Sequence, residues 1–162
     1  MNMEIRHGNL KDLEEITELE KKCFPVAEAA TRESFESRLK VFGEHFWLLT
    51  ENDRIISAVN GLCTDIPKLQ DAMYEDAGMH NPKGEWKMIF GVETLPERQG
   101  EGLATHLLKH VIEECRQQGR KGIVLTCKDE LIGFYEKVGF VHEGKSASEH
   151  GGVPWNDMRL KF

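Results

Sequence analysis

Arg98-Gln99-Gly100-Glu101-Gly102-Leu103-Ala104 is the stretch of this 162-residue chain that decides its fold. It joins an expected strand to an amphipathic helix that stops at Gly119 and has apolar residues at steps of three and four. Such a turn leaves backbone N–H groups uncovered, and the helix dipole adds positive potential there. It therefore suits a pyrophosphate: Gly100 and Gly102 let the phosphates approach, and Ala104 lets the helix pack close to the sheet.

Three kinds of phosphate ligand use turns of this type. A P-loop requires Lys followed by Ser or Thr after its last glycine, whereas Leu103 and Ala104 follow here. A dinucleotide fingerprint has a differently spaced third glycine or alanine early in a βαβ unit, whereas this turn lies past the chain midpoint. Coenzyme A is the remaining ligand. Taken alone, the turn equally fits a tight structural turn without any ligand.

Outward from the turn, strand and helix patterns alternate without a repeat or a linker, as in one α+β domain spanning residues 1–162. Its mixed central sheet is expected to have six to seven strands flanked by about four helices. Expected strands cover 3–6, 46–50, 55–62, 86–92, 122–127, 140–144 and 155–162. Expected helices cover 10–23, 31–41, 103–115 and 131–138, with a further short one near 69–74.

Local signals add detail to two of these helices and to one strand. Asn9 and Asp129 are expected to cap the helices that follow them, with Leu10 on the inward face of the first. The two-residue period of the strand 86–92 puts Trp86, Met88, Phe90 and Val92 on one face.

Composition excludes several function classes. No apolar run approaches the ~18 residues of a membrane span, and the N-terminus lacks a signal-peptide pattern. Four widely spaced cysteines without a Cys-x-x-Cys pair favour reduced thiols, which together with the missing signal predicts a cytoplasmic protein. The net charge of −7 argues against nucleic-acid binding and favours a cationic partner.

Two motifs in a fixed order carry a family resemblance. Gln99-x-x-Gly102-x-Ala104 resembles the Gln/Arg-x-x-Gly-x-Gly/Ala signature of the GNAT acetyltransferase superfamily. The later run Phe134-Tyr135-Glu136-Lys137-Val138-Gly139-Phe140 resembles the Phe-Tyr-x-x-x-Gly-Phe element of the same superfamily. Within it, the chain is similar to the arylalkylamine (serotonin-type) acetyltransferases and their bacterial relatives. The segments 24–30 and 127–131 support this second likeness.

The resemblance implies a GNAT fold with a V-shaped splay between the fourth and fifth strands, and acetyl-CoA (coenzyme A) bound in it. The pantetheine arm is expected to pair with the fourth strand like an added strand, and the glycine-rich turn to hold the pyrophosphate. The expected cofactor-binding residues are Phe90, Gly91, Val92, Arg98, Gln99, Gly100, Glu101, Gly102, Leu103, Ala104, Tyr135 and Lys137.

Acetyl transfer to an amine requires an acid that protonates the leaving thiolate and a base that takes a proton from the amine. Tyr135 is expected to protonate the departing thiolate, although its helical spacing also fits plain core packing. The serotonin enzymes have two histidines on the fourth strand, where this chain has Trp86 and Met88. Glu28, a lone carboxylate in an apolar stretch, is therefore the expected base, and it equally fits a charge favouring the next helix N-terminus. His80 is the alternative base.

We therefore expect direct acetyl transfer to a small primary amine, either arylalkyl or polyamine-like. The expected acceptor-binding residues are Phe24, Glu28, Trp86, Met88 and Thr126. Rival interpretations are a lysine or protein N-terminal acetyltransferase and a non-catalytic acyl-CoA-binding protein. Neither a nucleic acid nor a membrane is expected as partner, and the chain is expected to be a monomer or a homodimer.

No metal site is expected. His106 and His110 are four apart on one helix, a spacing that suits zinc, but no third ligand accompanies them. Cys127 ends a strand without a partner histidine, so a buried structural thiol is expected there rather than a covalent acetyl-cysteine.

Overall fold

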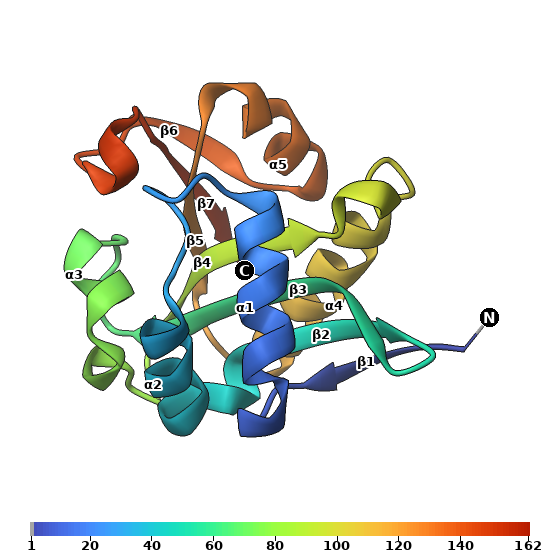
Figure 1. Cartoon of the computed structure of the whole chain (residues 1–162). Coiled ribbons are helices and arrows are strands. Elements are labelled where there is room, and N and C mark those ends of the chain that lie inside the picture. Colours follow the sequence, from blue (N-terminus) through green and yellow to red (C-terminus); the bar gives the residue numbers. More distant parts are fainter. Residues whose placement is uncertain (1) are drawn as a thin grey trace.

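The computed structural model describes residues 2–162, which form a seven-stranded mixed sheet (Figure 1). The strand order is β1-β2-β3-β4-β5-β7-β6, and all neighbouring strands are antiparallel except β4 and β5, which run parallel. The strands are β1 (Met3–His7), β2 (Phe46–Glu51), β3 (Arg54–Thr64), β4 (Trp86–Thr94), β5 (Gly122–Cys127), β6 (Val141–Lys145) and β7 (Asn156–Lys161).

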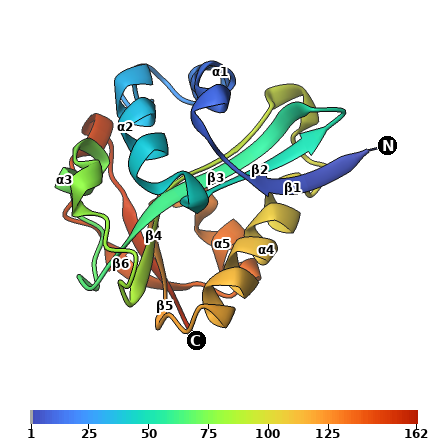
Figure 2. The ribbon, with the colours of Figure 1, turned by 90° about the horizontal axis from the view of Figure 1, so that it is seen from below.

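Helices cover both faces of the sheet, with α1 and α2 on one side and α4 and α5 on the other (Figure 2). Their apolar stripes face the strands, which gives a core on each side of the sheet. Across residues 2–162, no helix combines the length and the apolar character that crossing a membrane requires. The helices are α1 (Leu13–Cys23), α2 (Arg32–Phe42), α3 (Asp71–Glu75), α4 (Leu103–Gln117) and α5 (Ile132–Val138).

The expected α+β architecture is confirmed, and three local expectations are wrong. Asn9 caps a short 3₁₀ turn, Leu10–Asp12, in which the Leu10 side chain is 47% exposed. Asp129 does not cap a helix, because its carboxylate accepts hydrogen bonds from Lys145 and Asn156 on the β6–β7 side. The two-residue alternation of β4 also fails, and a bulge is the reason.

The bulge in β4 is centred on Phe90. Asn60 of β3 pairs with Gly91 and the next residue, Gly61, pairs with Ile89, so Phe90 has no partner on β3. An extra residue in one strand bends that strand and reverses its side-chain alternation, so Trp86, Met88, Phe90 and Val92 do not share one face.

The same bulge coincides with the parting of β4 from β5. The parallel ladder covers only Trp86–Ile89 against Gly122–Leu125, and beyond it β4 and β5 continue without pairing with each other. The expected V-shaped splay between the fourth and fifth strands is therefore confirmed. It leaves residues 90–92 of β4 on one side of the gap, and Thr126 and Cys127 of β5 on the other, without a partner strand across it.

Gly61 permits the close approach of β3 to the bulged strand. A Cβ atom at this position would lie 1.8 Å from the carbonyl oxygen of Met88, which is a backbone atom and cannot rotate away. We predict that Gly61→Ala destabilises the protein by about 3 kcal/mol through overpacking. Gly133→Ala is the control, because a Cβ atom there would meet nothing within 4 Å. Urea unfolding of both variants measures the difference, and equal stabilities would contradict this role of Gly61.

Candidate active site

A cavity occupies the splay and is lined from both of its arms. Phe90, Gly91 and Val92 contribute from β4, and Thr126 and Cys127 contribute from β5. Further lining residues come from α1, from α2 and from the segment between these two helices. Asn60 of β3 also lines the cavity, as do Tyr74, Glu75, Leu131, Tyr135, His150 and Trp155. A cavity that touches two parted strands exposes their unpaired backbone groups to a ligand.

The glycine-rich turn lies between β4 and α4 and is open to a phosphate. Gly100 and Gly102 have φ angles of 84° and 80°, which L-residues rarely adopt, and a Cβ atom at either position would have no neighbour within 4 Å. α4 begins after Gly102 without a side-chain cap, so its first N–H groups are available. An open turn with unused N–H donors fits the pyrophosphate of coenzyme A.

Charged side chains hold this turn in place. Arg98 pairs with Glu51 of β2 at 2.7 Å and with Glu101 of the turn at 2.9 Å. The hydrogen bonds that Arg98 donates to the carboxylates of Glu101 and Glu51 raise the pKa of Arg98. Gln99 Nε2 donates to the Thr94 carbonyl oxygen at 3.4 Å, across the base of the turn. Arg98 and Gln99 thus fix the backbone, and their side chains are committed to protein partners.

The other expected cofactor contacts lie on helices. Leu103 is buried and Ala104 half-buried in the first turn of α4, whereas Lys137 is exposed on α5. Tyr135 of α5 lines the cavity and packs edge-on against Phe134 and Phe140. Burial raises the pKa of Tyr135, so its phenol keeps its proton at neutral pH.

Glu28 also lines the cavity, and its carboxylate is committed to an ion pair. Its Oε1 and Oε2 atoms lie 2.7 Å and 2.9 Å from Lys128 Nζ, which comes from the segment after β5. The Glu28 carbonyl oxygen lies 2.8 Å from His150 Nε2. These contacts anchor the loop before α2 to the β5 side of the splay.

The expected acceptor-binding residues divide into two groups. Phe24 and Thr126 line the cavity, and the Thr126 hydroxyl lies 3.3 Å from the Tyr74 hydroxyl. Trp86 and Met88 lie in the paired part of β4 and do not line it. The Arg159 guanidinium covers the Trp86 ring at 4.7 Å.

Five residues at the cavity were not indicated by the sequence pattern: Glu20, Arg38, Asn60, Tyr74 and Glu93. The first four line it, and Glu93 contacts its wall at Gly91. A signal existed for Arg38, since it follows Phe35 by three residues on the apolar face of α2 and is only 4% exposed. A weaker sequence signal existed for Glu93, which is a charged residue between Val92 and Thr94 in a buried strand.

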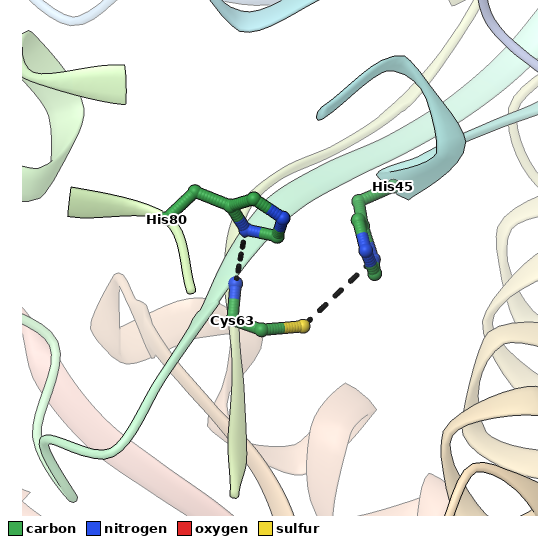
Figure 3. Close-up of side chains that lie close together, drawn as sticks. All are labelled: His45, Cys63 and His80. Carbon is green, nitrogen blue, oxygen red and sulfur yellow. Dashed lines mark hydrogen bonds between the residues drawn. The ribbon is translucent and has the colours of Figure 1, made fainter. Parts of the chain in front are cut away.

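A second polar cluster, His45, Cys63 and His80, lies away from the cavity (Figure 3). Its donor atoms lie within 4.8 Å of one another, yet each ring uses its Nδ1 lone pair. His45 Nδ1 faces Lys87 Nζ, and His80 Nδ1 accepts from the Cys63 N–H at 3.0 Å. Burial and Lys87 lower the pKa of His45 to about 2 and that of His80 to about 4. We therefore interpret His45 as a hydrogen-bonding partner of the buried Lys87 and His80 as an acceptor for the β3 backbone.

Cys127 lines the cavity and is 2% exposed. Burial, reinforced by the charges of Asp129 and Glu130, raises its thiol pKa to about 11. A thiol that keeps its proton at neutral pH is a poor nucleophile. The arrangement therefore favours direct transfer to an acceptor over a covalent acetyl-cysteine.

Comparisons with known proteins agree with this geometry. The profile of the acetyltransferase (GNAT) family matches residues 13–140. The chain is similar to human N-acetyltransferase 8B, with 25% identity over 114 residues that cover 68% of this chain and 44% of that protein. The chain thus spans less than half the length of that relative.

Two solved structures share the fold over nearly their whole length. The GphF GNAT-like decarboxylase in complex with isobutyryl-CoA has a TM-score of 0.85 at 20% identity, covering 98% of both chains. The ribosomal-protein-S18-alanine N-acetyltransferase of Escherichia coli has a TM-score of 0.73 at 19% identity, covering 99% of this chain and 94% of that one. With its splay, its open glycine-rich turn and a family match over most of its length, the chain belongs to the acetyltransferase (GNAT) family, whose acyl donor is acetyl-CoA.

Proposed function

We propose that this protein transfers the acetyl group of acetyl-CoA directly to a small primary amine. One observation carries the proposal: a single cavity joins the exposed β4 backbone at residues 90–92 to a pocket lined by aromatic rings and carboxylates. The β4 backbone suits the pantetheine arm, and the open turn at Gly100 and Gly102 suits the pyrophosphate. Leu103 and Ala104 begin the helix whose N–H groups face that turn, and the exposed Lys137 is a further proposed contact of the cofactor.

The pocket supports a cationic acceptor. Phe24, Phe90 and Trp155 supply apolar walls, and Glu20 and Glu28 supply negative charge. Aromatic faces and carboxylates both attract alkylammonium groups. The likeness to arylalkylamine acetyltransferases stays a prediction. An amine of that class, or a polyamine-like one, fits this lining.

The setting of the reaction is also proposed. The four cysteines are free thiols, and three are buried, as suits a reducing compartment. We therefore place the protein in the cytoplasm, acting as one acetyltransferase domain in a monomer or homodimer.

An acceptor panel tests this proposal. The wild-type protein is incubated with acetyl-CoA and 2-phenylethylamine, tryptamine, putrescine, spermidine, or a peptide with a free N-terminus and a lysine. Thiol release is followed continuously, and the product is identified by mass. We expect at least one small amine to accelerate release over the amine-free control. Acceleration by the peptide alone would favour a protein acetyltransferase, and acceleration by none would contradict the enzyme proposal.

Tyr135 is proposed as the acid that protonates the departing thiolate, since its raised pKa keeps it protonated. We predict that Tyr135→Phe lowers kcat by about 100-fold and leaves the Kd of acetyl-CoA within about threefold, because general acids contribute on this scale. Tyr74→Phe is the matched control, a half-buried cavity tyrosine whose hydroxyl faces Thr126. Equal kcat losses in the two variants would remove Tyr135 from the chemistry.

Glu28 is proposed to contact the acceptor, because its carboxylate lines the pocket beside Lys128. Glu28→Gln leaves the Lys128 ammonium without its ion-pair partner and facing a cationic substrate. We predict a rise in the KM for the amine on the order of tenfold, the scale of one charge-assisted hydrogen bond. Glu130→Gln, which removes a nearby exposed carboxylate, is the control. An unchanged KM in Glu28→Gln would place the acceptor elsewhere.

A further inference from the structure

Three charged side chains are buried together on the α1–α2 side of the splay. Glu20 of α1, Arg38 of α2 and Glu93 of β4 are 6%, 4% and 3% exposed. Within residues 2–162, Glu20 Oε1, Arg38 Nε and both oxygens of Glu93 have no hydrogen-bond partner although they are buried. A buried polar atom left unpaired costs about 1–3 kcal/mol, and more when it is charged. Three of these four atoms belong to two neighbouring carboxyl groups, which can hydrogen-bond to each other only when one of them carries a proton.

The two carboxyl groups meet beside the strand that we assign to the acyl donor. A Cβ atom on Gly91 would lie 3.1 Å from Glu93 Oε1 and 4.0 Å from Glu20 Oε1. Gly91 is the middle residue of the exposed segment 90–92, and the missing side chain leaves these oxygens next to the cavity. Glu20 lines the cavity directly, while its Oε2 accepts from the Ala30 N–H at 2.8 Å.

Arg38 directs its hydrogen bonds to groups other than the two carboxyl groups. Its Nη1 donates to Asn60 Oδ1 at 3.1 Å and its Nη2 to the Tyr74 carbonyl oxygen at 3.0 Å, with the guanidinium held over the Phe90 ring at 4.7 Å. Two carboxylates and one fixed guanidinium carry one negative charge in excess. One further proton, or one cationic group from the cavity, balances it.

We propose that Glu20 and Glu93 act as a carboxyl pair that takes the proton of the acceptor's ammonium group before the amine attacks the thioester. This inference rests on the proposed acetyl transfer and deepens it by naming the proton acceptor and a protonated primary amine as the entering species. It assigns to the pair the proton transfer that the sequence pattern assigned to Glu28.

The proton balance is simple. With both carboxyl groups ionised, the ammonium R–NH₃⁺ enters and transfers one proton to a carboxylate oxygen, leaving R–NH₂ and one protonated carboxyl group. The neutral amine nitrogen has the lone pair that bonds to the acetyl carbon, and the carbon–sulfur bond breaks. Tyr135 donates its phenolic proton to the leaving thiolate and regains a proton as the nitrogen loses its second one, and the pair later returns its own proton to solvent. Overall, one ammonium yields one amide, one thiol and one proton.

The environment of the pair suits a base for alkyl ammonium groups. Burial, then the charge of Glu20, then the hydrogen bond that protonated Glu93 donates to the Glu20 carboxylate raise the pKa of Glu93 well above its ordinary value. Cys23 of α1 raises it further, and Arg38 of α2 opposes the shift. A base acts best when its pKa lies near the working pH, between that of a free carboxylate and that of the amine.

The kinetic test uses 2-phenylethylamine and putrescine, taking whichever gives the higher kcat/KM with the wild-type protein. We expect Glu20→Gln/Glu93→Gln to lower kcat/KM by about 100-fold, the low end for general-base loss. The wild-type profile should fall as pH drops below the pKa of the pair. In Glu93→Gln, the part of the acid limb that comes from Glu93 should be lost. Glu75→Gln, which removes an exposed carboxylate from the same cavity, should keep the wild-type profile.

A stability measurement separates this role from a structural one. The pKa of Glu93 is higher in the folded protein than in the unfolded chain, so the unfolded chain loses the Glu93 proton first as pH rises. At pH values above the unfolded-state pKa of Glu93, this difference lowers the stability of the wild-type protein. Glu93→Gln keeps the shape of the protonated side chain and removes this penalty. Its Tm at pH 8 should therefore equal or exceed the wild-type Tm while turnover falls.

The outcomes are distinct. Suppose that the wild-type protein turns over either amine, and that the double variant keeps kcat/KM within about threefold of wild type with an unchanged pH profile. This result overturns the carboxyl pair and leaves the proposed function standing. If Glu28→Gln alone moves the acid limb, Glu28 is the base and the pair is again overturned. Absence of turnover with every amine of the panel overturns both the function and the pair. ¹³C NMR of the wild-type glutamate carboxyl carbons adds a mutant-free check: titration of all of them in the ordinary range contradicts the pair.

Discussion

The point at which β4 stops pairing with β5 is the constraint on which the rest of this structure depends. A bulge at Phe90 turns the strand, and Gly61 lets β3 follow it at a distance that no side chain would tolerate. Parallel strands normally satisfy their backbone groups against each other, and a parted pair leaves those groups unpaired. The energetic cost of that parting is offset only when another extended chain takes the empty place. A pantetheine arm has the length and the amide groups to do so.

The same parting arranges the two ends of the reaction on opposite sides of one strand. Toward α4, the chain leaves β4 through a turn whose glycines and uncapped helix start offer bare N–H groups. Toward α1 and α2, the bulge brings Gly91 against two buried carboxyl groups and a guanidinium. The proposed sites of phosphate recognition, thioester placement and proton removal thus all border one departure from regular pairing. Burying unpaired charge lowers stability, and functional sites are where proteins tolerate this loss.

Local sequence patterns predicted most of the fold and the position of the glycine-rich turn. Gln99, Gly102 and Ala104 indicated the turn, the regular spacing from Leu103 to Cys115 indicated α4, and the parting of the fourth and fifth strands followed from family likeness. The acceptor half was harder to predict. The bulge at Phe90 depends on how close β3 approaches at Gly61, so a strict two-residue period does not describe β4. Trp86 and Met88, which family likeness assigned to the acceptor, do not line the cavity. Glu20 and Glu93 are 73 residues apart and meet only when α1 packs against β4.

The claim that the exposed β4 segment receives the acyl donor is tested most directly by hydrogen exchange with and without saturating acetyl-CoA. The account predicts slower amide exchange in two separate stretches, residues 90–92 and residues 99–105, with little change in the paired residues 86–89. Protection confined to other regions, or none at a concentration at which calorimetry detects binding, would contradict it.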